Sequence, residues 1–171
     1  MKKTILIIML LCFVTSFLRA EEPEKQTKEA FGYFDFGASV FAYPFFLFPS
    51  VDFGYRKQVN SLGFDVSIGV NSWAVVNELH GSAVLHYFPH PDLLGEYYVG
   101  LGADVGHWFL AHYSAGTVIA PKFVFGRKFR NDNDQNRFWQ ASLLCPNCVT
   151  GCNYKYVHNY PVVEFKYGLG F

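Results

Sequence analysis

Residues 160–171, at the end of the chain, alternate between apolar side chains and small or charged ones. Counting back from the end, the apolar positions are Phe171, Leu169, Tyr167, Phe165 and Val163. The positions between them hold Gly170, Gly168, Lys166, Glu164 and Val162. Successive side chains of a β-strand point to opposite faces, so this pattern predicts a strand with one apolar face. Such a strand suits either a half-buried soluble sheet or a membrane barrel.

The same period of two recurs along most of the preceding chain. Further strands are predicted at about 31–42, 51–56, 62–70, 78–87, 96–106, 116–125 and 138–144. In the clearest of them, Leu62, Phe64, Val66, Ile68 and Val70 alternate with Gly63, Asp65, Ser67 and Gly69. Eight segments of about ten residues are the number and length that a minimal membrane β-barrel needs. An even number of strands places both chain ends on one side, which we expect to be periplasmic.

Connections are predicted wherever the alternation stops. They cover residues 43–49, 57–61, 71–77, 89–92, 107–114, 127–136 and 145–159. Pro121 lies inside the sixth strand and predicts a bulge or irregularity, because proline cannot donate to the sheet ladder. The charged segment 127–136 conflicts mildly with the topology, because periplasmic turns of such barrels are short.

The polar face of the predicted strands carries small and charged side chains. Its glycines are Gly63, Gly69, Gly100, Gly102, Gly106, Gly168 and Gly170. An eight-stranded barrel is only just wide enough for interior side chains, so glycines there relieve crowding. The charges on this face are Asp35, Asp52, Asp65, Glu96, Asp104, Glu164, Arg56, Lys122 and Lys166. Because buried charges require partners or water, the pattern predicts a lumen plugged by ion pairs rather than an open pore.

Composition points to a surface that is partly not meant for water. The chain of 171 residues, long enough for one domain, is 51% hydrophobic, 19% aromatic and only 16% charged. A soluble domain has about a quarter of its residues charged. Trp73, Trp108 and Trp139 lie at or near predicted strand ends, which fits the aromatic girdles of membrane barrels.

The first twenty residues have the features of a secretory signal peptide. Two lysines precede an apolar run at 5–14, and Ala20 provides a small residue for cleavage. The run is too short to span a bilayer as a helix, and Cys12 follows two leucines where a lipoprotein signal requires a small residue. Residues 21–30 are predicted to be a flexible periplasmic leader, and residues 31–171 the outer-membrane barrel. Removal of residues 1–20 leaves 11 basic against 14 acidic side chains, a charge of about −3, and no basic block indicates nucleic acid.

The closing strand that ends on Phe171, together with the alternation over 31–171, resembles the small bacterial outer-membrane barrels of the OmpA transmembrane-domain and OmpX type. This resemblance implies an all-β fold: an antiparallel eight-stranded transmembrane β-barrel of up-and-down topology. It also implies a place in the outer membrane of a double-membraned bacterium, in contact with its lipid. Barrel-assembly machinery would recognise the C-terminal strand. The alternative fold is a soluble sandwich or a lipocalin-like periplasmic ligand-binding barrel, with the apolar face inside.

Three cysteines, Cys145, Cys148 and Cys152, lie in the longest predicted connection. A zinc site is disfavoured because structural zinc usually draws on two separated ligand pairs. An exported protein meets an oxidising environment, so disulfide formation is the expected use. Three is an odd number, which leaves one thiol for a bond to a neighbouring envelope protein, and the spacing does not choose the pair.

Residues 112–116, with His112 and Ser114, are similar to the His-x-Ser-Asn-Ala-Gly segment of outer-membrane lipid A 3-O-deacylases. This chain lacks the asparagine, and no acidic residue lies nearby in sequence to orient the histidine, as a catalytic triad requires. The expected function is therefore a non-enzymatic structural or surface-interaction role, with no cofactor and no metal. A lipid-modifying enzyme is the alternative.

Overall fold

The structure, a computed structural model, describes residues 28–41, 46–73, 76–90, 95–110, 113–131, 133–150 and 160–171. Its strands are β1 (Lys28–Phe41), β2 (Phe46–Val59), β3 (Leu62–Trp73), β4 (Val76–Tyr87), β5 (Tyr97–Leu110), β6 (Tyr113–Arg130), β7 (Asn136–Leu144), β8 (Asn147–Thr150) and β9 (Val162–Gly170). Within these ranges no helix has the length and hydropathy needed to cross a membrane.

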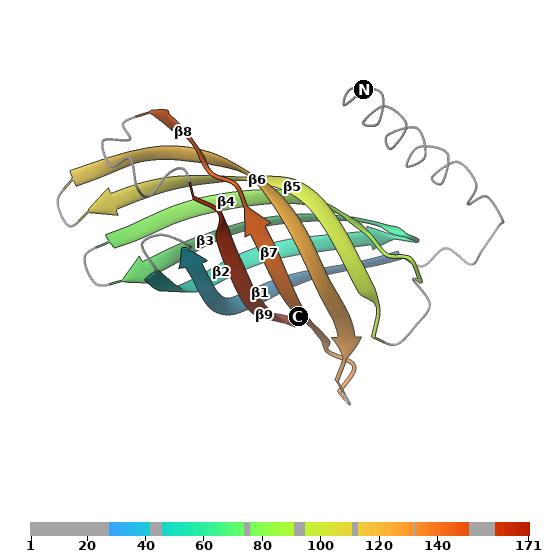
Figure 1. The fold of residues 1–171 in the computed structure, drawn as a ribbon. Coiled ribbons are helices and arrows are strands. Elements are labelled where there is room, and N and C mark those ends of the chain that lie inside the picture. The colour runs from blue at the N-terminus through green and yellow to red at the C-terminus, as the bar shows by residue number, and fades with distance from the viewer. Residues whose placement is uncertain are drawn as a thin grey trace, which may run out of the picture.

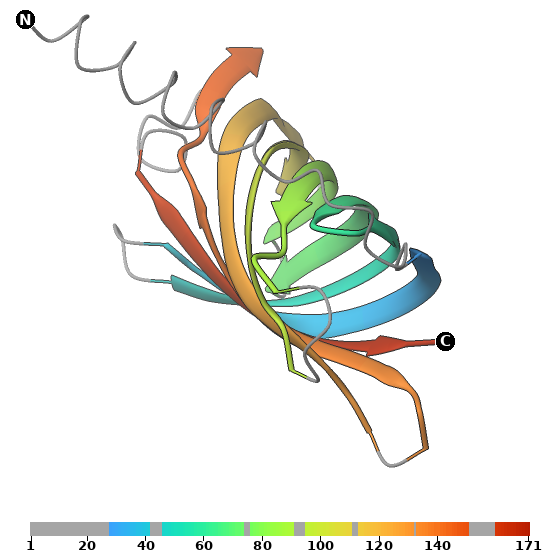
Figure 2. The same ribbon diagram turned by 90° about the vertical axis from the view of Figure 1, so that its right-hand side faces the viewer.

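The strands form one closed antiparallel sheet (Figure 1). Eight of them follow in the order β5-β4-β3-β2-β1-β9-β7-β6, and β6 pairs again with β5, which completes a circle of eight strands. The ninth, β8, is a short strand that pairs with β6 beyond the ladder between β6 and β7. Figure 2 shows the strands curving around a common interior. The predicted all-β, eight-stranded, up-and-down barrel is therefore confirmed.

The last strand completes the circle by pairing with β1 on one side and β7 on the other. The ladder with β1 runs from Tyr33 opposite Gly170 to Phe41 opposite Val162. Beyond it, the Phe171 amide donates to the Gly32 carbonyl at 2.9 Å. The first and last strands therefore meet along their length. We call the end where β1 finishes the mouth, and the opposite end the turn end.

Side chains alternate between the two faces of the barrel wall as the sequence predicts. In β3, Phe64, Val66 and Ile68 are exposed on the outside, whereas Gly63 and Asp65 are buried inside. The seven glycines assigned to the polar face all face the interior. The cross-strand register fixes which side chains face inward, because a slip of one residue would turn every side chain of a strand to the other face.

The strands are longer than predicted, and most predicted connections are correspondingly shorter. β1 begins inside the predicted leader 21–30, β2 begins inside 43–49, and β8 lies within 145–159. Strand residues also occupy parts of 57–61, 71–77, 107–114 and 127–136. The strand ends that the sequence assigned to connections contain polar residues or prolines, and these residue types predicted turns. In a closed barrel each strand has a neighbour on both sides, so the ladder continues past the apolar positions.

The conflict posed by segment 127–136 disappears for the same reason. β6 continues to Arg130 and β7 starts at Asn136, so the connection is only residues 131–135. Asn131 and Gln135 close it through a backbone hydrogen bond of 3.0 Å. The turn is thus as short as the topology requires.

The prolines inside strands lie where a ladder is interrupted. Pro49 pairs with Ala38 of β1, but the ladder of β2 with β3 ends one residue further on, at Ser50. Pro121 lies at the gap between the ladders that β6 forms with β7 and with β8. The predicted irregularity at Pro121 is therefore present on this side of β6, whereas pairing with β5 continues through it.

Two of the three tryptophans face outward and one does not. Trp73 and Trp139 are exposed, as an aromatic girdle requires. Trp108 is only 4% exposed and lies inside the barrel, so its assignment to the girdle is wrong. It shares the inward face of β5 with Asp104 and Gly106, and position alone would have indicated this.

Candidate functional site in the barrel lumen

Buried side chains point into the barrel interior in three groups, and each group has a distinct chemistry. The Arg56 cluster, in the middle, consists of Arg56, Asp65, Tyr33, Tyr98, Phe138 and Gln140. The turn-end cluster consists of Glu29, Gln58, Glu96 and Lys128. The mouth cluster consists of Asp35, Asp52, Glu78, His80, Asp104, Lys122, Glu164 and Lys166, below an apolar collar.

Arg56 is fully buried and binds groups from several strands at once. Its Nε donates to Asp65 Oδ2 at 2.7 Å, and its terminal nitrogens donate to the Tyr98 hydroxyl and the Gln140 amide oxygen, both at 3.2 Å. Tyr33 donates its hydroxyl to the other Asp65 oxygen at 2.8 Å. A buried charge persists only when it is paired and hydrogen-bonded, and both conditions are met here.

Three aromatic rings surround the guanidinium. The Arg56 carbon lies 4.2 Å from the Phe138 ring centre, 4.9 Å from that of Tyr98 and 5.6 Å from that of Tyr33, all within cation–π range. Phe138 and Tyr33 also contact each other edge to face, with centres 5.0 Å apart. The cluster therefore joins β1, β2, β3, β5 and β7 across the interior.

Glycines create the space that these rings occupy. Gly54 lies directly across from Tyr33, Gly126 across from Tyr98, and Gly168 across from Phe138. A Cβ atom at any of the three glycines would overlap the opposing ring. Each ring therefore lies over the backbone of the neighbouring strand, which lets a narrow barrel hold three aromatic side chains and an arginine.

The turn-end cluster is organised by Lys128. Its ammonium donates to Glu29 Oε2 and to Gln58 Oε1, both at 2.6 Å, and lies 3.4 Å from Glu96 Oε2. It also lies 5.4 Å from the ring centre of Phe88. These contacts link β1, β2 and β6 to the segment that precedes β5 and place charged groups at this end of the interior.

The polar part of the mouth cluster holds more acids than bases. Lys166 pairs with Asp52, which also lies 3.2 Å from His80 Nε2. Lys122 lies 3.0 Å from Glu164 and 3.9 Å from Asp104. Five buried carboxylates, Asp35, Asp52, Glu78, Asp104 and Glu164, face these two lysines and one histidine.

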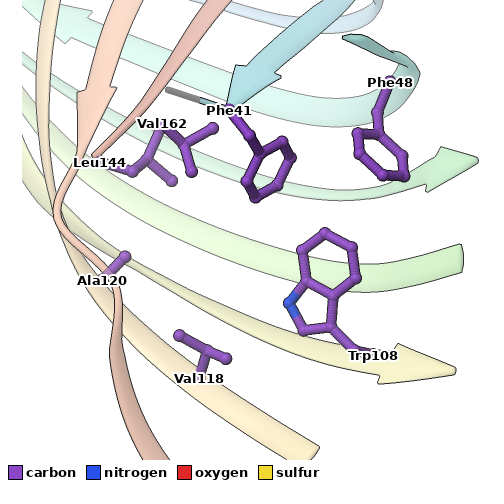
Figure 3. Close-up of a cluster of buried hydrophobic side chains, with 7 residues drawn as sticks. All are labelled: Phe41, Phe48, Trp108, Val118, Ala120, Leu144 and Val162. Carbon is purple, nitrogen blue, oxygen red and sulfur yellow. The ribbon is translucent and has the colours of Figure 1, made fainter. Parts of the chain in front are cut away.

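The apolar collar lies at the mouth, where it lines one cavity together with acids of the mouth cluster. Figure 3 shows its side chains. The collar consists of Phe41, Phe48, Trp108, Val118, Ala120, Leu144 and Val162. The rings of Phe41, Phe48 and Trp108 contact one another edge to face, with centres 5.1 to 5.8 Å apart. Collar and carboxylates together line a cavity of about 30 Å³.

The charged residues that the sequence assigned to the lumen are all buried there, and most form ion pairs. The sequence assignment missed the inward aromatic residues, among them Tyr33, Tyr98, Phe138 and Phe41. Each has the same parity as the polar residues of its strand, so strict alternation would have found it. Lys128 and Glu29 were missed because their segments were assigned to a turn and a leader.

The remaining sequence candidates lie largely outside the described residues. Cys145 is exposed and carries a free thiol. Cys152, His112 and the side chains of Cys148 and Ser114 are not described, so disulfide pairing and the His-x-Ser alternative stay predictions. Among the described residues, no group of three or more His, Cys, Asp or Glu side chains is arranged to hold a metal ion.

Apolar side chains outside and charged side chains inside a closed circle of eight strands define a small transmembrane-type β-barrel. No protein-family model and no curated protein matches the chain. Among solved structures, the crystal structure of Neisserial surface protein A (NspA) matches with a TM-score of 0.60 at 12% sequence identity. The match covers 86% of this chain and 98% of that one. At this identity the match establishes the fold, and it confirms the resemblance to small outer-membrane barrels at that level.

Proposed function

We propose that this chain is a non-enzymatic integral protein of the outer membrane, with a structural or surface-interaction role and a lumen plugged by its own side chains. The observation that carries the proposal is the reversal of the usual burial pattern. Large apolar side chains such as Phe53, Ile68 and Leu101 are exposed on the outer wall, while Asp, Glu, Lys and Arg are buried within. A lipid environment accommodates the exposed apolar side chains, and ion pairing compensates the buried charges.

The Arg56 cluster supports the plugged lumen. Its bonds run between strands on different sides of the circle, from β2 to β5 and to β7. A solute crossing the barrel would have to displace a fully buried guanidinium and its partners. The turn-end cluster adds a second layer of paired charges below it.

Membrane fractionation tests the location, followed by electrophoresis of heated and unheated samples. The protein should sediment with outer membranes and change its mobility on heating, because a closed barrel resists unfolding in detergent. Recovery from the soluble fraction without detergent would overturn the proposal and favour the ligand-carrying periplasmic barrel.

Liposome swelling tests the plug. Proteoliposomes of the wild-type protein should not admit small sugars, whereas Arg56→Ser/Lys128→Ser, which removes the central group of both clusters, should admit at least small solutes if the barrel still shows the heat-dependent mobility shift. Wild-type swelling comparable to that of a general porin would remove the plugged lumen from the proposal.

The end of β9 supports recognition by barrel-assembly machinery. Phe171 is 83% exposed; its amide donates to the Gly32 carbonyl of β1, and its ring lies beside Gly32. Phe171→Ser should slow assembly in cells while leaving refolding of the purified protein into lipid vesicles unchanged. Equal slowing in both settings would mean that Phe171 stabilises the barrel rather than serving as a recognition signal.

Lipid A analysis tests the absence of catalysis. Mass spectrometry of lipid A from expressing cells should show no loss of an acyl chain. A loss that disappears in both His112→Ala and Ser114→Ala would replace this proposal with the lipid-modifying enzyme.

A further inference from the structure

The cavity in the mouth of the barrel has two unlike walls. Asn71, Glu78, Asp104 and Glu164 form the polar wall, towards the middle of the barrel. Phe41, Trp108, Val118, Leu144 and Val162 form the apolar wall, from the collar. A volume of about 30 Å³ has room for roughly two water-sized groups. The cavity therefore suits a small polar head with a slender apolar extension.

The polar wall carries acceptors that the protein itself does not satisfy. Asp104 is buried, and its Oδ2 atom has no hydrogen-bond partner among the described residues. Lys122 lies 3.9 Å from that oxygen, beyond hydrogen-bond length, and is closer to Glu164 at 3.0 Å. Glu78 accepts a hydrogen bond from Asn71 at 2.7 Å, and no described lysine or arginine pairs with it. Asp104, with Lys122 only at 3.9 Å, and Glu78, with no described lysine or arginine paired to it, are the least compensated acids of the polar wall.

Gly106, which pairs with His80 across β4 and β5, makes room for the neighbouring Glu78 side chain. A Cβ atom at Gly106 would overlap the carboxylate of Glu78, so the glycine provides the space in which that carboxylate lies. Gly106, Asp104 and Trp108 share the inward face of β5, and all three line the cavity. One strand thus contributes an acceptor, the space for a second acceptor and an aromatic wall.

We propose that this cavity binds the primary ammonium end of an unbranched aliphatic amine. An ammonium group is compact, carries three donors and suits the carboxylates of Asp104, whose Oδ2 has no hydrogen-bond partner among the described residues, and Glu78. The first methylene would fill the rest of the cavity against Trp108, and the remaining chain would pass along Phe41 and Val118 of the collar towards the mouth, where its burial is favourable. A trimethylammonium head exceeds the room available. This inference goes beyond a structural role, because it gives the barrel a ligand class.

Fluorine NMR of protein labelled with 5-fluorotryptophan, held in zwitterionic lipid nanodiscs, tests the inference. The chain has three tryptophans, and only Trp108 lines the cavity, while Trp73 and Trp139 face outward. Hexylammonium chloride should shift the Trp108 resonance saturably. The other two resonances should drift only in proportion to partitioning into lipid. Trp108→Phe assigns the signal.

Matched probes separate the contribution of the ammonium charge to binding from that of the apolar chain. 1-Hexanol, hexanoate and hexyltrimethylammonium should not produce the saturable shift. Nα-acetyl-lysine amide distinguishes the source of the ammonium: saturation by it would identify a lysine side chain of a partner as a ligand. Saturation by hexylammonium alone would identify a free amine. A saturable shift with 1-hexanol of equal affinity would overturn the inference, as would no saturable shift with either amine.

Two conservative variants and one control complete the test. Asp104→Asn and Glu78→Gln should each weaken the apparent Kd for hexylammonium by at least about tenfold, because each removes a hydrogen bond to a charged acceptor. Asp134→Asn makes the same change at an exposed site in the turn at 131–135 and should leave the Kd unchanged. Each variant is first checked for the heat-dependent mobility shift. Unchanged affinity in a folded Asp104→Asn or Glu78→Gln protein would overturn the site.

Discussion

Replacing Arg56 by Met would remove the charge at the centre of the lumen while keeping much of the side-chain volume. The variant loses hydrogen bonds to Asp65, Tyr98 and Gln140. Asp65 would keep only the hydrogen bond from Tyr33, at 2.8 Å, and would remain a buried carboxylate without its arginine.

The expected loss of unfolding free energy is about 3–5 kcal/mol, the usual cost of breaking one side of a buried ion pair. Loss of cation–π contact adds to it, because the rings of Phe138 and Tyr98 lie within 5 Å of the guanidinium carbon. Methionine offsets a part, since its flexible chain can fill the space between the rings.

The assay is urea-dependent folding into lipid vesicles, followed by tryptophan fluorescence. Asp65→Asn alone should cost a similar amount, because it leaves the arginine unpaired. The double variant Arg56→Met/Asp65→Asn should cost less than the sum of the single variants by at least about 2 kcal/mol, since neither charge is then left alone. Lys57→Met, at the adjacent outward position, is the control and should not destabilise the barrel.

Two results would refute this reasoning. One is a loss below about 1 kcal/mol for Arg56→Met, which would mean that water or neighbouring groups solvate Asp65 without its arginine. The other is strict additivity in the double variant, which would mean that the two charges do not depend on each other.

Three further predictions test the two faces of the wall and its exposed thiol. Val66→Arg should destabilise insertion by about 2–4 kcal/mol because Val66 faces lipid, whereas Ser67→Arg, facing the lumen, should cost less in the same folding assay; equal tolerance would reverse the faces. Gly168→Ala should cost about 1–3 kcal/mol, because its Cβ would overlap the Phe138 ring, whereas Gly81→Ala meets only a backbone oxygen at 3.7 Å and should be near neutral. Envelope fractions on non-reducing gels should show higher-mass species that collapse with reductant and vanish when Cys145, Cys148 and Cys152 are all replaced by Ser; a ladder that persists in that variant would exclude the cysteines as its cause.

The sequence predicted the face of the apolar and charged side chains inside its strands, because parity along a strand depends on nothing beyond the strand itself, but it misplaced Trp108 and missed the inward aromatic residues. It predicted strand ends less well. Lys128 and Arg130 were assigned to a turn because charge is common in turns, yet Lys128 points into the lumen and holds Glu29 and Gln58. Charge at a strand end does not distinguish a solvated turn from a paired interior position.

The pairing of Arg56 with Asp65 shows what register adds to parity. The two residues lie directly opposite each other across β2 and β3, joined by the two-residue turn at Asn60 and Ser61. Asn60 has a positive φ of 52°, which asparagine tolerates in tight hairpins. Assigning the whole of 57–61 to the turn hid this pair, since a five-residue turn leaves the register of the two strands open.

The aromatic residues around Arg56 follow from register in the same way. Tyr33 on β1, Tyr98 on β5 and Phe138 on β7 each lie across from a glycine on the next strand of the circle. All three rings therefore lean in the same direction around the barrel, and their centres all lie within 5.6 Å of the Arg56 guanidinium carbon. Parity alone places an aromatic residue and a glycine on the inward face of their strands. It does not show whether the ring crowds another side chain or whether the glycine leaves an empty space. Only the cross-strand pairing shows that each glycine accommodates a ring, and that three such pairs leave a site that a planar guanidinium can fill.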